Sequence, residues 1–366
     1  MRPSPADRPP VSDGWLSDPE AALEEAFAVK PDPTAVALPS GVATGIGSLP
    51  GTDINEAVRT VFGELPDWPY LPELPGRGVG SDMIGRGAAL LAGLPVQWWA
   101  SGWQLADLPG RDARRAADFL ERDLDALHEV ADAATGPVRL TAVGPFTLAS
   151  HLWRRTGGAM IGDHGALADL TGSLAEGLRH FTAAAQARLP RAQLSIQLDE
   201  PGLPAALAGR VHTESGLNFY RRVPVESARD RLREVVDALD IPVVVHCCST
   251  EVPLRLLQEA GVGAIALDLT LIGLDDVAAV DALGEYLDSD GRILAGVIPG
   301  FGKADPGMAE RAAGRITALW ERLGFDPELI AQQVSVTTTC GMAGASWDYA
   351  REAMRAGREA ARRLRG

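Results

Sequence analysis

Cysteine is scarce in this chain: only Cys247, Cys248 and Cys340 occur among its 366 residues. Two of the three are adjacent, which makes a poor framework for disulfide bonds. A disulfide-rich scaffold is therefore excluded. In a reducing compartment, three such side chains would bind a metal or remain free thiols.

Long apolar runs are also missing. No stretch of eighteen consecutive apolar residues occurs that could form a membrane-spanning helix. Four prolines, at positions 3, 5, 9 and 10, stand where a signal peptide would need its apolar segment. We therefore expect a cytoplasmic protein with no membrane partner.

Positive charge is in short supply as well. The chain has 34 basic and 49 acidic residues, and its formal net charge is −15. The one Arg-rich stretch, residues 351–365, alternates with Ala and Glu at helical spacing and indicates the solvated face of a last helix. Since no basic patch offsets the net charge, we expect no nucleic-acid partner.

The hydrophobic content, in contrast, is 46%, which is ample for a large core. Residues 1–40 are rich in Pro, Asp and Ala, with one short amphipathic piece at 19–29. We predict a short, loosely packed N-terminal extension there. Residues 41–366 are predicted to form one domain in which strands alternate with helices.

This α/β pattern is regular enough to count. The second half contains five predicted strands, each followed by a helix, at residues 192–198, 242–245, 264–269, 293–298 and 334–338. The first half adds strands at 42–46, near 97–100 and at 138–143. Eight βα units predict a closed (β/α)8 barrel, with an open doubly wound sheet as the alternative. Residues 45–50 lack the third glycine of a dinucleotide-binding fingerprint, which disfavours that alternative.

Polar side chains fall at the ends of these predicted strands. They are Ser48, Asp199, Glu200, His246, Cys248, Asp268 and Cys340. A closed barrel would place all of them around one mouth. Two thiolates, an imidazole and a carboxylate could there complete a tetrahedral zinc site.

Each residue alone also has an ordinary structural explanation. Cys247 should point opposite to its neighbours and so belong to the core. Asp268 can cap the segment that follows it, Ser48 can be a helix N-cap, and Asp199 can be a hydrogen-bonded strand end. The coincidence of several ligand types at three strand ends is what favours a metal.

The motifs, taken in order, resemble those of the cobalamin-independent methionine synthases, and specifically their C-terminal catalytic barrel. The resemblance runs over residues 42–362. Its motifs are Ile46-Gly47-Ser48-Leu49-Pro50, Ile196-Gln197-Leu198-Asp199-Glu200-Pro201, the pair His246 and Cys248, and Cys340-Gly341.

The resemblance implies a zinc-dependent S-methyltransferase that transfers a methyl group to the zinc-activated thiolate of homocysteine and so produces methionine. It implies that zinc is held by His246, Cys248 and Cys340. Asp268 would be the fourth ligand, at a position where the family usually has Glu. A metal that displaces the thiol proton gives a nucleophile at neutral pH, so the chemistry is coherent.

The substrate contacts follow from the same resemblance. The segment Ile46, Gly47 and Ser48 would hold the amino-acid carboxylate, and Asp199 would pair with the ammonium group. Glu200 is a further candidate for substrate binding. The residues that we expect to act in catalysis are Asp199, His246 and Cys248.

Three departures from the family concern the substrates. The full-length synthases have a second barrel that helps to bind folate, and this chain has no room for one. Arg77 lies in a stretch where the family has an acidic residue for the substrate ammonium. The segment 295–303 contains no histidine, whereas the family has one there to protonate the leaving folate nitrogen. Since a methylated corrinoid needs no such proton, we expect a corrinoid protein as the methyl donor.

Other functions stay open at this point. Arg77 would favour a related zinc methyltransferase acting on another small thiol, such as one that carries a sulfonate. A uroporphyrinogen decarboxylase-like enzyme would need no metal. A non-catalytic zinc-binding module would fill all four coordination positions from close ligand pairs.

Overall fold

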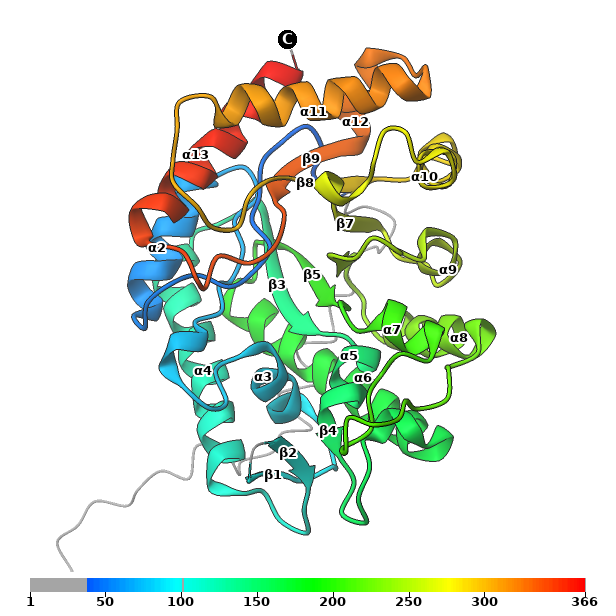
Figure 1. Ribbon diagram of the computed structural model, residues 1–366. Helices are drawn as coiled ribbons and strands as arrows, with labels where there is room; N and C mark the ends of the chain where they lie inside the picture. The colour runs from blue at the N-terminus through cyan, green and yellow to red at the C-terminus, as the bar shows by residue number, and fades with distance from the viewer. Residues whose placement is uncertain (1–37, 101, 366) are drawn as a thin grey trace, which may run out of the picture.

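A six-stranded parallel sheet forms the centre of the molecule, in the order β3-β5-β6-β7-β8-β9. The computed structural model describes residues 38–100 and 102–365; the predicted piece at 19–29 lies outside these ranges. The strands are β3 (Pro137–Val143), β5 (Gln193–Asp199), β6 (Val243–Cys247), β7 (Ala264–Asp268), β8 (Ile293–Ile298) and β9 (Val334–Thr338). Figure 1 shows the sheet curled, with helices around its outer side.

Helices follow the strands in sequence and cover the sheet. The longer ones are α2 (Ile54–Glu64), α3 (Met83–Leu90), α4 (Arg111–Ala131), α6 (His164–Arg188), α8 (Val225–Asp237), α10 (Val277–Asp288), α11 (Met308–Leu323) and α13 (Trp347–Leu364). The short ones are α5 (Pro145–His151), α7 (Leu203–Ala208), α9 (Leu254–Glu259) and α12 (Ile330–Gln333). Short 3₁₀ turns, η1 to η4, occupy Pro75–Arg77, Met160–Gly162, Leu269–Leu271 and Pro327–Leu329.

Local sequence explains where these elements begin and end. β6 is a run of β-branched valines that is buried on both faces, as a central parallel strand requires. Asp163 caps α6 by accepting a hydrogen bond from the Ala166 N–H at 2.9 Å. α11 ends at Gly324, whose φ of 70° lies in the left-handed region that glycine adopts without strain.

The predicted strands of the second half are confirmed, but the prediction of a closed eight-stranded barrel is wrong. Residues 42–46 form only an isolated bridge, Ala43 to Val336, and the gap between β9 and β3 is spanned without regular strands. Two irregular segments connect these edges through the hydrogen bonds Thr44 N–H to Val336 O, Leu49 N–H to Glu73 O and Leu71 N–H to Arg139 O. Glycines and prolines in both segments prevent a continuous ladder, so the fold is barrel-like with a six-stranded sheet.

The predicted strand near residues 97–100 exists but lies elsewhere. β1 (Val96–Trp99) pairs in antiparallel fashion with β2 (Gly102–Leu105), and β2 pairs with β4 (Leu152–Trp153) in a separate small sheet. Figure 1 places this sheet at the lower end of the molecule, away from the curled sheet. Because β1 and β2 pair with each other as a hairpin, these residues do not join the central sheet.

The folded body extends slightly further toward the N-terminus than residue 41. Leu38 is buried with Ile46, Trp68 and Val244 in an apolar cluster. Its carbonyl oxygen accepts a hydrogen bond of 2.8 Å from Arg292 Nη1. Among the described residues, no helix combines the length and apolarity needed to span a bilayer.

Candidate metal centre and substrate site

His246, Cys248 and Cys340 form a compact cluster at the carboxyl ends of the strands. One ligand atom from each lies within 4.8 Å of the others, and the Sγ atoms of Cys248 and Cys340 are 3.9 Å apart. His246 is the fourth residue of β6, Cys248 directly follows that strand, and Cys340 follows β9. Curling of the sheet therefore brings two distant strand ends together, as the sequence predicted.

His246 has one ring nitrogen engaged and one available. Nδ1 lies 3.2 Å from the carbonyl oxygen of Ala266 on the neighbouring strand β7. Nε2 is buried and has no hydrogen-bond partner among the described residues. A backbone carbonyl that binds Nδ1–H selects the tautomer whose Nε2 lone pair points outward, which is the usual arrangement of a metal-bound histidine.

The thiols of Cys248 and Cys340 differ in pKa. The hydrogen bond with Cys248 is the largest cause that lowers the pKa of Cys340, to about 4, and His246 lowers it further. The same contact with Cys340, together with burial, raises the pKa of Cys248. The contact therefore favours the thiolate form of Cys340, the form in which sulfur binds metals.

This donor set fits zinc. One imidazole and two thiols are a known catalytic set that leaves a fourth position open. Two thiolates at 2.3 Å from a tetrahedral ion lie about 3.8 Å apart, close to the separation found here. Cys247, by contrast, is fully buried, and burial raises the pKa of its thiol to about 12, so its predicted place in the core is confirmed.

Asp268, the predicted fourth ligand, does not join the cluster. It ends β7, and its Oδ1 atom accepts hydrogen bonds from the N–H of Thr270 at 2.8 Å and from the Thr270 hydroxyl at 2.6 Å. Asp268 therefore caps the 3₁₀ turn η3, because the chain turns at once after the strand. A metal held by His246, Cys248 and Cys340 would therefore have its fourth position open to another ligand.

The segment Ile46 to Ser48 is held by its backbone carbonyls. Ile46 O accepts from Gln197 Nε2 at 2.7 Å, Gly47 O from the Glu73 N–H at 3.2 Å, and Ser48 O from the Met342 N–H at 2.7 Å. Among the described residues, the N–H groups of Gly47 and Ser48 have no hydrogen-bond partner. They are therefore free to bind an anion such as a carboxylate.

Asp199 and Glu200 end β5 but have different surroundings. Asp199 is buried, accepts a hydrogen bond of 2.7 Å from Gln197 Nε2, and lies opposite His246 in the sheet register. Burial is the largest cause that raises the pKa of Asp199, to about 7.

Both Glu200 oxygens are already occupied. They accept hydrogen bonds from the N–H groups of Phe146 and Thr147 at 2.8 Å each and from the Thr147 hydroxyl at 2.7 Å. Glu200 therefore holds the first turn of α5, and the substrate contact expected for it stays a prediction. Its burial raises the pKa of this carboxyl to about 7.

Comparisons with known proteins agree with this arrangement. The model of the cobalamin-independent synthase catalytic domain matches residues 169–363, more than half of the chain. This chain belongs to that family. The match includes the sheet from β5 to β9, and with it both cysteines and the histidine of the cluster. The chain is thus a methionine synthase-like catalytic domain.

Solved structures support the fold. A B12-independent methionine synthase from Shewanella sp. W3-18-1, in complex with selenomethionine, is 14% identical, with a TM-score of 0.60 over 89% of this chain and 98% of that chain. The GH113 β-mannanase AaManA from Alicyclobacillus acidocaldarius is 13% identical, with a TM-score of 0.43 over 90% of this chain and 97% of that chain. The second likeness is too weak to carry an argument. No curated protein sequence matches this chain.

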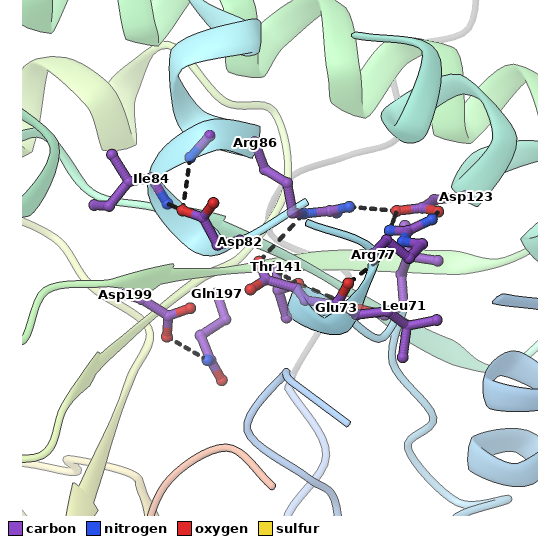
Figure 2. Close-up of polar contacts among 12 residues, drawn as sticks. Leu71, Glu73, Arg77, Asp82, Ile84, Arg86, Asp123, Thr141, Gln197 and Asp199 are labelled. Carbon is purple, nitrogen blue, oxygen red and sulfur yellow. Dashed lines mark hydrogen bonds and ion pairs between the residues drawn. The ribbon is translucent and has the colours of Figure 1, made fainter. Parts of the chain in front are cut away.

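Sequence reasoning missed one buried acid of this cobalamin-independent synthase domain. Glu73 forms the isolated bridge with Ser48, and its side chain is almost fully buried. Its Oε1 atom lies 3.3 Å from Arg86 Nε and 3.5 Å from the Thr141 hydroxyl. Figure 2 shows Glu73 and Asp199 in the same view, on either side of Thr141 and Gln197. The signal in the sequence was weak, because Glu73 belongs to none of the recognised motifs.

Arg77 does not face the substrate region as a free cation. Its Nη1 and Nη2 atoms donate to the two carboxylate oxygens of Asp123 at 2.6 and 2.9 Å, and its guanidinium lies 4.6 Å from the centre of the Phe119 ring. Asp123 lies on α4, forty-six residues further along the chain. The charge that distinguished this stretch of sequence is thus neutralised within the protein.

Proposed function

We propose that this chain is a zinc-dependent S-methyltransferase that methylates the thiol of homocysteine and so forms methionine. The observation that carries the proposal is the three-ligand cluster of His246, Cys248 and Cys340, which has the composition of a catalytic zinc site with one open position. Membership in the cobalamin-independent synthase family supports it. The structurally similar methionine synthase holds selenomethionine, an analogue of the product.

The segment that carries the cluster residue Cys340 is in direct contact with the proposed amino-acid site. Gly341, next to the ligand Cys340, lies so close to Ser48 that an added Cβ would be 2.1 Å from the Ser48 hydroxyl oxygen. Met342 N–H binds the carbonyl oxygen of Ser48. An amino acid whose carboxylate binds the free N–H groups of Gly47 and Ser48 is therefore anchored beside the segment that carries the metal ligand.

The chemistry needs a thiolate held in a fixed orientation. Bound zinc supplies the means to remove the thiol proton at neutral pH. The sulfur lone pair then forms the S–CH3 bond, while the bond between the methyl carbon and its donor breaks and leaves its electron pair on the donor. The chain's own contribution is orientation: residues 46–48 hold the carboxylate and Asp199 holds the ammonium group, so that the sulfur faces the methyl group.

A methyl-corrinoid protein is the donor that we propose. Gly300, in the loop after β8, packs against the backbone of Cys340 and Gly341, so this loop borders the cluster. Residues 299–303 of the loop carry no carboxylic acid or imidazole that could protonate a leaving folate nitrogen, and Phe301 is 75% exposed there. A corrinoid leaves without a proton, so it suits this rim better than a folate does.

The alternatives have less support. A sulfonate-bearing thiol would need the cation of Arg77, but Asp123 occupies it. A decarboxylase of the uroporphyrinogen type has no use for the ligand cluster. A non-catalytic zinc module would supply four ligands, and Asp268 is not among those that assemble. We further propose that the enzyme acts in the cytoplasm, as its cysteine content suggests.

The test is methionine formation by the zinc-loaded protein. L-Homocysteine is supplied with methylcobalamin or, separately, with methyltetrahydrofolate. We expect methionine from methylcobalamin alone, with Cys340→Ser inactive and Cys247→Ala active. Equal turnover with both donors would overturn the corrinoid assignment, and methionine from neither donor would overturn homocysteine as the acceptor.

A further inference from the structure

Arg139 lies inside the molecule where the two irregular segments meet β3. It is the third residue of that strand, and its side chain is fully buried. Its backbone binds one segment: the N–H donates to Pro69 O at 2.9 Å, and the carbonyl accepts from the Leu71 N–H at 2.8 Å. Its guanidinium reaches the other segment, where Nη2 donates to the carbonyl oxygen of Gly45. Arg139 therefore links three stretches of chain at the place where a closed barrel would have further strands.

Two aromatic rings and a glycine define the position of the guanidinium. Its central carbon lies 5.0 Å from the centre of the Trp68 ring and 5.6 Å from the centre of the Tyr70 ring, within the range of cation–π contacts. Gly45 approaches Tyr70 so closely that an added Cβ would be 2.4 Å from the ring atom Cε1. Among the described residues, the Gly45 carbonyl has no backbone partner. Arg139 therefore supplies the hydrogen bond that this buried carbonyl needs.

The charge of Arg139 is poorly compensated. In the part of the chain that the structure describes, the side chain forms no ion pair, and its Nε and Nη1 atoms are buried without a partner. Burial is the largest cause that lowers its pKa, to about 10, so the group stays cationic at neutral pH; the charge of Asp199 opposes this shift. A buried charge is costly unless an opposite charge balances it. An anion that binds near Arg139 would therefore be favoured.

The segment that follows Gly45 lies between Arg139 and Asp199. Gln197 Nε2 donates to Ile46 O and to Asp199 Oδ1, at 2.7 Å each, and Figure 2 shows Gln197 beside Asp199. A trans peptide directs its N–H opposite to its C=O, so the peptide whose carbonyl binds Arg139 directs the Ile46 N–H away from the guanidinium. Like the N–H groups of the next two residues, this one has no partner among the described residues. Three successive N–H groups are thus available beside a buried cation.

We propose that Arg139 is a positioning residue for the substrate carboxylate. It fixes the Gly45 peptide so that the N–H groups of residues 46–48 can bind the carboxylate, and its charge favours an anion there. This inference rests on the proposed function and names what that site selects: thiols that carry both charges of an α-amino acid. The ammonium group faces Asp199 and the carboxylate faces the segment that Arg139 holds, so the zwitterion matches two buried charges of opposite sign.

The test compares two thiols that differ only in the carboxylate. Binding of L-homocysteine and of 3-amino-1-propanethiol to the zinc-loaded protein is measured by calorimetry, for the wild type and for Arg139→Met. We expect the wild type to prefer homocysteine by about tenfold or more, the scale of a hydrogen bond to a charged group. Arg139→Met should lose most of this preference by binding homocysteine more weakly, with zinc content and binding of the aminothiol unchanged.

Ser195→Ala is the matched control. Ser195 is the register partner of Arg139 on β5, and its buried hydroxyl has no hydrogen-bond partner among the described residues. This variant should keep the wild-type preference. Should Arg139→Met not fold, Arg139→Lys carries the test: it keeps the charge but lacks the planar fork that reaches Gly45, and it should lose the preference several-fold.

Kinetics with methylcobalamin as the donor give a second readout. Arg139→Met should raise the KM for homocysteine several-fold and leave kcat nearly unchanged, because the carboxylate is remote from the reacting sulfur. A folded Arg139 variant that keeps the full preference, or that binds both thiols more weakly to the same extent, would overturn the positioning role. Wild-type protein that binds both thiols equally well would overturn it too, while thiol methylation stands. Zinc-loaded wild type that binds neither thiol would overturn the proposed function itself.

Discussion

The Sγ atoms of Cys248 and Cys340 lie 3.9 Å apart although ninety-two residues separate them in the chain. One follows β6 and the other follows β9, and only the curl of the intervening sheet brings them together. Because each contributes one of three ligands, Cys248→Ser and Cys340→Ser should each reduce zinc from one ion per chain to well below one. Metal analysis of the purified variants checks this.

Cys247 provides the matched control for these substitutions. It is adjacent to Cys248 but is fully buried on the other side of the strand. Cys247→Ala should keep one zinc per chain and lose about 1 kcal/mol of stability through the small cavity. Loss of zinc from this variant, with retention by Cys340→Ser, would contradict the ligand assignment.

Substitution of Asp268 distinguishes a capping role of this residue from a metal-binding role. Its carboxylate accepts both hydrogen bonds that Thr270 donates at the start of η3. Asp268→Ala should therefore lower the free energy of unfolding by about 0.5–2 kcal/mol, as loss of a cap does. Zinc content should be unaffected, and its loss would show that Asp268 is a ligand after all.

Glu200 should matter for stability rather than for substrate affinity. Its carboxylate receives three hydrogen bonds from the first turn of α5. Glu200→Ala leaves those buried groups unpaired, at a cost of about 1–3 kcal/mol for each. Denaturant unfolding measures the loss. Glu200→Gln keeps an acceptor oxygen and should retain the wild-type KM for homocysteine; a raised KM with normal stability would point to a substrate contact.

Gly341 couples the metal ligand to the proposed carboxylate site. A Cβ on Gly341 would overlap the Ser48 hydroxyl, whereas a Cβ on nearby Gly344 would meet nothing within 4 Å. Gly341→Ala should displace Ser48 and raise the KM for homocysteine at least tenfold, since small misplacements of a bound substrate are costly. Gly344→Ala, the control, should behave like the wild type. Similar kinetics for both variants would show that Ser48 does not anchor the substrate.

Sequence patterns predicted the part of the fold that is locally encoded. The strands 293–298 and 334–338 match β8 and β9 because each is a compact β-branched run between clear helices. The strand predicted at 42–46 is reduced to an isolated bridge. These residues lie where a barrel strand would lie, but Gly41, Gly45 and Gly47 interrupt the ladder of hydrogen bonds. The predicted strand near 97–100 is present as β1, but it lies outside the central sheet because it pairs with its hairpin partner β2.

Part of the candidate site could likewise be predicted from the sequence, and part could not. His246, Cys248 and Cys340 could be predicted because strand ends of a parallel sheet converge by topology. The different tasks of Asp268 and Glu200 could not, since a carboxylate at a strand end caps a turn or binds a ligand depending on the next few backbone atoms. Glu73 and its support by Arg86 and Asp123 depend on contacts between α3, α4 and the irregular closing segment, which no local pattern encodes.

Cobalt substitution tests the central claim most directly, because thiolate ligands of Co²⁺ produce strong near-ultraviolet absorption whose intensity follows their number. We predict one Co²⁺ per chain with thiolate absorption that is lost in Cys248→Ser and Cys340→Ser. The absorption should increase when L-homocysteine is added and stay constant with L-homoserine, which has a hydroxyl in place of the thiol. Absorption that does not respond to homocysteine would contradict a site that binds and activates the substrate thiol.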